Sequence, residues 1–166
     1  MICLETERLI LRNTCETDAE VMFDYRNDDR CARYQRGQTK DLPGIQKLVQ
    51  DRKYDTITDA ENFMVAVQRK DTGKLIGEIV VMPNDGCFSI GYTFHYNYHR
   101  QGYAFEALSF LTELLHTQYP KLEFISFTEP ENVASMALLK KLGYQDLGYA
   151  PKVESQVFGK WLQEEA

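Results

Sequence analysis

The stretch YNYHRQGYAFEAL, residues 96–108, places a glycine and a basic residue where extended chain changes to a helical pattern. A helix that begins directly after a turn leaves its first backbone N–H groups unpaired at the positive end of the helix dipole. Such a junction suits a phosphate or pyrophosphate. Gly102 can adopt conformations closed to other residues, Ala104 is small, and Arg100 adds positive charge. We therefore predict an anion site here; the alternative is a simple turn with a solvated arginine.

The N-terminal third of the chain predicts one strand followed by helices. Branched apolar residues alternate with polar ones over 8–13, which indicates a strand. Thr17 and Glu20 have the spacing of a capping box, and the apolar residues that follow predict a helix over 17–26. The stretch 28–58 is the least regular part of the sequence, and we expect helical pieces separated by loop-like chain.

Later segments predict an antiparallel meander followed by alternating helices and strands. Pro120 ends the helix that follows the anion site, and a second helix has Asn132 as its N-cap and Gly143 at its end. The expected strands are 62–69, 75–82, 87–94, 121–128, 144–150 and 153–161. The order predicts one domain over residues 1–166, of the α/β (α+β) class, with a mixed, mostly antiparallel central sheet flanked by helices.

Composition and charge argue against several classes of protein. A net charge of −6 disfavours a nucleic-acid binder and suits a cationic partner such as an amine. The N-terminus lacks the basic start of a signal peptide, and no apolar run approaches the ~20 residues of a membrane span. The cysteines lack metal-ligand spacing, so we expect reduced thiols in a cytoplasmic protein without nucleic-acid or membrane partners: Cys3, Cys15, Cys31 and Cys87.

Two further motifs extend the pattern. ENVASMALLKKLGY (131–144) follows the loop HRQGYA (99–104), and LETERLILR opens the chain. Together they resemble the GNAT N-acetyltransferase superfamily, whose pyrophosphate loop is Gln/Arg-x-x-Gly-x-Gly/Ala and whose later helix begins Asn-x-x-Ser/Ala and ends Lys-x-Gly-Phe/Tyr. TERLILR and GYAFEAL resemble the branch that includes the ribosomal-protein-alanine N-acetyltransferases. The resemblance runs from Thr6 to Tyr144, with His99 where Gln or Arg is usual.

The resemblance implies that acetyl-CoA is the co-substrate. Its pantetheine arm would pair with the backbone of Phe94 and Tyr96, and Asn132 and Ser135 match the positions that contact the arm and its thiol end. Its pyrophosphate would bind the backbone N–H groups of Arg100, Gln101, Gly102, Tyr103 and Ala104.

Acetyl transfer needs an acid for the departing thiolate, and the usual one is missing. Many relatives use a tyrosine in the last helix, and the matching residue here is Leu139. Ser135 is then the candidate acid. Its alternative interpretation is a helix-surface serine bonded to its own backbone. A backbone N–H near Phe94 would stabilise the oxyanion.

The base that deprotonates the amine is also unusual. Many relatives of this branch carry a glutamate two residues before GY on the fourth strand, and here that residue is Ser89. The candidates are Glu129, which we favour, His95, or water, and Glu129 and His95 could both face the place where the strands separate. Tyr92 lies on the same strand, and the alternative for all three residues is a wall of the substrate site or the protein surface. His95 and His99 lie four residues apart in a predicted loop without a third ligand, so we expect no metal site.

We therefore expect an acetyl-CoA-dependent N-acetyltransferase that transfers the acetyl group directly to a primary amine. The acceptor would be a protein N-terminus or a small molecule, with specificity set by 28–58 and the final hairpin. The missing tyrosine and glutamate leave an alternative: a catalytically degenerate domain that binds acetyl-CoA as a sensor or partner module.

Overall fold

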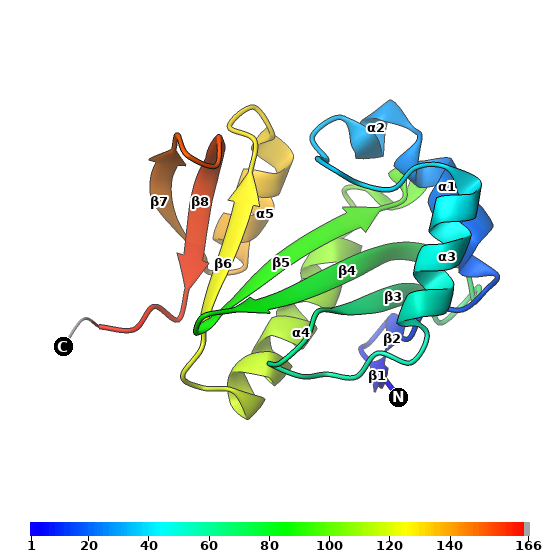
Figure 1. The fold of residues 1–166 in the computed structure, drawn as a ribbon, viewed down its shortest axis with the longest axis horizontal. Helices are drawn as coiled ribbons and strands as arrows, with labels where there is room; N and C mark the ends of the chain where they lie inside the picture. The colour runs from blue at the N-terminus through cyan, green and yellow to red at the C-terminus, as the bar shows by residue number, and fades with distance from the viewer. Residues whose placement is uncertain (165–166) are drawn as a thin grey trace.

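The computed structural model describes residues 1–164, which form an eight-stranded sheet with five α-helices and one 3-10 turn (Figure 1). The strands are β1 (Cys3–Glu5), β2 (Leu9–Arg12), β3 (Phe63–Arg69), β4 (Leu75–Asn84), β5 (Cys87–Phe94), β6 (Glu123–Thr128), β7 (Gln145–Ala150) and β8 (Ser155–Lys160). The helices are α1 (Asp18–Arg26), α2 (Asp29–Ala32), α3 (Leu42–Arg52), α4 (Tyr103–Gln118) and α5 (Val133–Lys141), and the 3-10 turn is η1 (Tyr96–Tyr98).

The sheet has the order β1-β2-β3-β4-β5-β6-β8-β7, and every neighbouring pair except β5 and β6 is antiparallel. This confirms the expected mixed, mostly antiparallel sheet. The parallel strands β5 and β6 pair only where 87–89 lie beside 123–125. Beyond these residues the two strands spread apart (Figure 1). We call the gap between 90–94 of β5 and 126–128 of β6 the wedge.

Helices cover both faces of the sheet because successive side chains of a strand point to opposite faces. Phe88, Ile90 and Phe94 of β5 belong to the core that contains the apolar residues of α4 and α5. Met64 and Ala66 of β3 belong to a second cluster, which packs against α1 and α3. Figure 1 shows α3 and α4 on opposite sides of the sheet. No helix within residues 1–164 is long and apolar enough to cross a membrane.

The capping-box prediction at the first helix is wrong. The Thr17 side chain makes no capping hydrogen bond, although the helix begins at Asp18, within one residue of the expected start. Asp18 accepts the backbone N–H of Cys15 at 2.8 Å and pairs with Arg12 at 2.8 Å, so the neighbouring carboxylate holds the helix start. The strand β1 was not predicted; at three residues it is too short to show a period.

Segment 33–41, which joins α2 to α3, is the irregular chain expected within 28–58. A buried ion pair beneath it joins Arg26 of α1 to Glu78 of β4 at 2.5 Å, and Arg26 also donates to the Thr39 carbonyl at 2.9 Å. Burial raises the pKa of Glu78, and Arg26 opposes that shift. Gln38 donates to the Thr93 hydroxyl at 3.0 Å. The irregular segment is therefore fastened to the sheet beside the wedge.

Candidate active site

The start of α4 has the geometry that the anion prediction requires. Gly102 is the N-cap, with a φ of 82° in the left-handed region that favours glycine, and Arg100 has a φ of 61°. The first intrahelical bond runs from the Glu106 N–H to the Gly102 carbonyl at 3.0 Å. The backbone N–H groups from Gly102 to Phe105 therefore lack intrahelical partners. They lie at the positive end of a sixteen-residue helix dipole.

Glu106 fastens this helix start to the N-terminal strand. Its carboxylate accepts the Thr6 hydroxyl at 2.5 Å, the Arg8 backbone N–H at 2.8 Å and the Arg8 Nε–H at 2.6 Å. Burial alone would raise the pKa of Glu106, but the hydrogen bonds from Thr6 and Arg8 outweigh it and lower that pKa. Arg8 also donates to the Gln101 carbonyl at 3.0 Å and lies 4.2 Å above the Tyr103 ring. The sequence motifs TERL (6–9) and GYAFEAL (102–108) are therefore in contact in the fold, because Thr6 and Arg8 of the first bond to Glu106 of the second.

The backbone of β5 presents its polar groups to the wedge. His95 donates its N–H to the Ile76 carbonyl of β4 at 2.8 Å. In an antiparallel pair the residues that bond to the neighbouring strand alternate along the chain. The N–H and C=O groups of Tyr92 and Phe94 therefore point away from β4 and into the wedge. These are groups that an extended ligand could pair with.

Side chains bond to the carbonyls of Tyr92 and Phe94 and to that of Ile90, which precedes them by the same alternation. Ser126 donates to Ile90 at 3.0 Å, and Gln35 donates to Tyr92 at 3.2 Å. The Phe94 carbonyl lies 2.6 Å from Nε2 of His99 and accepts the Cys31 thiol at 3.1 Å. Burial raises the pKa of Cys31 to about 11, which keeps the thiol protonated as a donor. His99, the unusual first residue of the loop motif, thus binds the carbonyl of a predicted pantetheine contact.

Ser135 and Asn132 lie together at the N-terminus of α5. The Asn132 side chain accepts the Ser135 backbone N–H at 3.2 Å, which confirms Asn132 as the helix cap. The Ser135 hydroxyl lies 2.7 Å from the hydroxyl of Tyr92 on β5. Burial raises the pKa of Tyr92, and the hydrogen bond with Ser135 opposes that shift. Leu139, at the position of the family's tyrosine, is 2% exposed in the core.

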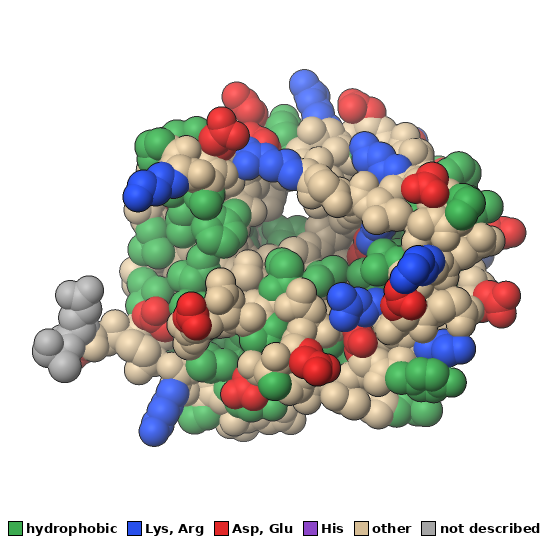
Figure 2. Space-filling model, in the orientation of Figure 1, with side chains coloured by type: hydrophobic (Ala, Val, Ile, Leu, Met, Phe, Trp, Pro, Cys, Tyr) green, Lys and Arg blue, Asp and Glu red, His purple; other side chains and the backbone are tan. Residues whose placement is uncertain are grey.

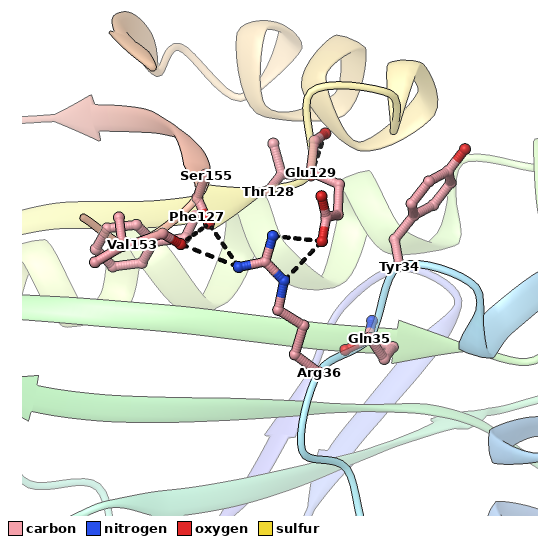
Figure 3. A pocket seen from close by; sticks show the side chains of 8 residues that line it. All are labelled: Tyr34, Gln35, Arg36, Phe127, Thr128, Glu129, Val153 and Ser155. Carbon is pink, nitrogen blue, oxygen red and sulfur yellow. Dashed lines mark hydrogen bonds and ion pairs between the residues drawn. The ribbon is translucent and has the colours of Figure 1, made fainter. Parts of the chain in front are cut away.

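A cavity of about 310 Å³ opens beside the wedge, lined by 34–36, 127–129, Val153 and Ser155 (Figure 3). Figure 2 shows the molecule hollowed in its middle on this face. Arg36 enters the cavity from segment 33–41 and donates through Nε to Glu129 at 2.6 Å. Its other nitrogens donate to the carbonyls of Val153 at 3.0 Å and Glu154 at 2.6 Å. Glu129 therefore faces the cavity, with its carboxylate paired to an arginine.

His95 lies outside that cavity and has partners at both ring nitrogens. Its Nδ1 accepts the Asn97 backbone N–H at 3.0 Å, which places the ring proton on Nε2, 3.3 Å from an oxygen of Asp24. The side chain is buried and packs on Tyr96, with ring centroids 4.0 Å apart. Tyr96 in turn donates to Asp24 at 2.9 Å. The roles of His95 and Glu129 as bases and of Tyr96 as a cofactor contact stay predictions.

The site thus combines a helix start of the kind suited to phosphate with a strand edge whose backbone groups face the wedge. A family model described as an acetyltransferase (GNAT) domain matches residues 8–145. The chain belongs to the GNAT acetyltransferase family.

Relatives and solved structures agree with this assignment. The uncharacterized N-acetyltransferase YnaD of Bacillus subtilis (strain 168) is 28% identical over 151 residues, covering 90% of this chain and 86% of its own. The ribosomal-protein-S5-alanine acetyltransferase of Vibrio fischeri has 18% identity and a TM-score of 0.75, covering 96% of each chain. The microcin C7 self immunity acetyltransferase MccE, solved with acetyl-CoA and AMP, has 15% identity and a TM-score of 0.77, covering 93% of each chain. The two structures show likeness of fold.

Proposed function

We propose that this acetyltransferase uses acetyl-CoA and transfers the acetyl group directly to a primary amine. One observation carries the proposal: three features lie in order from the start of α4 back along β5 into the wedge. They are the N–H groups of α4 without intrahelical partners, the wedge-facing backbone of Phe94 and Tyr92, and the Tyr92–Ser135 pair. This order matches the pyrophosphate, the pantetheine arm and the thioester of acetyl-CoA.

Binding would rest mainly on backbone groups. The N–H groups of residues 100–104 would hold the pyrophosphate, and Arg8 and Arg100 would add positive charge. The arm would add to β5 as an extended strand and take over carbonyls that Gln35 and His99 now occupy. Asn132 and Ser135 would lie at the thiol end.

The transfer would then need three catalytic contributions: stabilisation of the oxyanion, protonation of the departing sulfur and deprotonation of the acceptor ammonium. A wedge-facing N–H of β5 would stabilise the oxyanion that forms on the thioester carbonyl. A hydroxyl at the Tyr92–Ser135 pair would protonate the departing sulfur. The acceptor ammonium must lose a proton, to Glu129, to His95 or to water. In the structure Glu129 is paired with Arg36, so its service as a base requires that the arginine move away.

The acceptor would enter through the cavity beside Arg36. We propose a protein N-terminus or a small-molecule amine, which agrees with the net charge of −6. The Vibrio fischeri neighbour is a ribosomal-protein-S5-alanine acetyltransferase, which supports a protein N-terminus as the acceptor. The four cysteines are free thiols, which fits the reducing cytoplasm that we propose as the location.

A second candidate function has one observation in its favour. The proposed bases are both occupied, Glu129 by Arg36 and His95 by Asn97. A domain of this kind could bind acetyl-CoA without turnover and act as a sensor or partner module.

The deciding experiment incubates the purified chain with acetyl-CoA and a panel of amines, followed by mass spectrometry of the acceptors. The panel contains peptides that begin with alanine or serine, the same peptides with a blocked N-terminus and an internal lysine, free amino acids and a polyamine. We expect an acetylated acceptor within the panel. Calorimetry with CoA runs alongside: binding without turnover supports the sensor, and no binding overturns both functions.

A further inference from the structure

The hydrogen bond between Tyr92 and Ser135 crosses the wedge from β5 to α5 at 2.7 Å. Tyr92 is also a residue whose backbone N–H and C=O point into the wedge, and its ring lies 6.4 Å from that of Phe94. Its hydroxyl therefore lies at the end of the path that begins at α4. Ser135 and Leu139, the positions that the family pattern marks for the acid, both lie on α5, whereas Tyr92 lies on β5.

We propose that Tyr92 is the general acid for the departing sulfur and that Ser135 is its positioning residue, an inference that rests on the proposed function. The lone pair of the deprotonated amine forms the C–N bond, and the C–S bond breaks with its electron pair on sulfur. The Tyr92 O–H proton passes to that sulfur, giving the CoA thiol. Once the C–N bond has formed, the nitrogen is positively charged, and it loses its extra proton through solvent to the phenolate, which gives the neutral amide and restores Tyr92. The proton that the acceptor ammonium released before the attack stays in solvent.

The chemistry of the two hydroxyls assigns these roles. A phenol has an ordinary pKa of about 10 and a thiol of about 8.5, so the phenol is the hydroxyl nearer to the sulfur in acidity, even though burial raises the pKa of Tyr92. An alcohol such as that of Ser135 is a far weaker acid. A phenolate oxygen can only accept hydrogen bonds, so Ser135 must donate to Tyr92 once the proton has left.

The surroundings of Tyr92 keep its proton in place at neutral pH. Burial raises its pKa, and Ser135 is the hydrogen-bond partner that opposes the shift. Tyr144, which follows α5, is the titratable group beside it within the described chain, and burial raises the pKa of Tyr144 as well. Tyr92 is therefore a protonated donor until the solution is strongly alkaline.

The first test is Tyr92→Phe, which removes one oxygen and leaves the ring. We expect kcat to fall by about 100-fold, the lower end of general acid catalysis, with the CoA affinity from calorimetry unchanged. Ser135→Ala should lower kcat by about 10-fold, since it removes the partner of the acid and not the acid. Tyr54→Phe is the matched control, because that hydroxyl is on a side chain 82% exposed beyond α3, and it should leave kcat unchanged.

The second test changes the acidity of the phenol without removing it. Replacement of Tyr92 by 3,5-difluorotyrosine lowers the pKa of the phenol, so the alkaline limb of the kcat profile should move to lower pH. The same replacement at Tyr144 should leave the limb in place. A kcat for Tyr92→Phe within about threefold of the parent, or an unmoved limb, overturns the inference while the proposed function stands. A parent protein without turnover on any amine overturns both.

Discussion

Replacement of Glu106 tests whether the contact between the N-terminal strand and the start of α4 stabilises the fold. The carboxylate receives three hydrogen bonds, two from Arg8 and one from Thr6. Each bond to a charged group contributes roughly 1.5–3 kcal/mol, but they share one acceptor and the Arg8 side chain is 41% exposed, so the sum is discounted. We expect Glu106→Ala to cost about 3 kcal/mol and Glu106→Gln, which keeps one acceptor oxygen, about 2 kcal/mol.

Urea denaturation and calorimetric melting measure this cost. For a chain of this size about 3 kcal/mol corresponds to a fall in Tm of roughly 6–12 °C. The matched control is Glu113→Gln, also on α4 but with a side chain 61% exposed, which should change stability by less than about 0.5 kcal/mol. The reasoning is refuted if Glu106→Ala and Glu113→Gln cost the same.

The same carboxylate gives a dependence on pH. Its pKa is lower in the folded chain than in the unfolded chain, so its contribution to stability is complete above the unfolded pKa. That contribution is lost as the pH falls through the folded pKa. The stability difference between the parent and Glu106→Gln should therefore shrink as the solution is acidified.

Two further predictions concern the proposed ligand and the base. Gly102→Ala should weaken CoA binding about tenfold, since a side chain in the left-handed region costs roughly 1–2 kcal/mol and its Cβ would lie 3.3 Å from Arg8. Gly102→Glu should abolish CoA binding. An unchanged CoA affinity in calorimetry would show that the predicted anion site is wrong. If Glu129 is the base, Glu129→Gln should flatten the acidic limb of kcat/KM and cost about 100-fold, whereas the same result from His95→Ala would transfer the role to the histidine. If the acidic limb of kcat/KM is unchanged in both Glu129→Gln and His95→Ala, water accepts the proton of the acceptor amine.

The sequence predicted what depends on local pattern. Apolar periodicity located the longer strands and helices, and Gly102 and Asn132 marked the starts of α4 and α5 as the structure has them. At the first helix Thr17 and Asp18 are both residues that can cap, and which of them acts depends on Arg12, a tertiary partner. The spacing of residues in the sequence alone therefore does not show whether Thr17 or Asp18 holds the helix start.

The contacts across the wedge could not be predicted. Tyr92 and Ser135 are 43 residues apart in the chain, and Arg36 and Glu129 are 93 apart. Each pair meets only because β5 and β6 pair over three residues and then diverge, and the alternation of apolar residues in either strand gives no sign of that divergence. The loop residue Arg36 has no periodic neighbours that would mark it for a role.

Mechanically, the short pairing of β5 with β6 makes the sheet two plates on one narrow joint. One plate is β1 to β5 and the other is β6, β8 and β7. The Tyr92–Ser135 and Arg36–Glu129 bonds each cross the wedge between the two plates, away from the three residue pairs that form the joint. A ligand between the plates would be released by a small rotation about the joint. Its residence time would then depend on β8, which lines the cavity through Ser155, and on the edge strand β7, which pairs with β8.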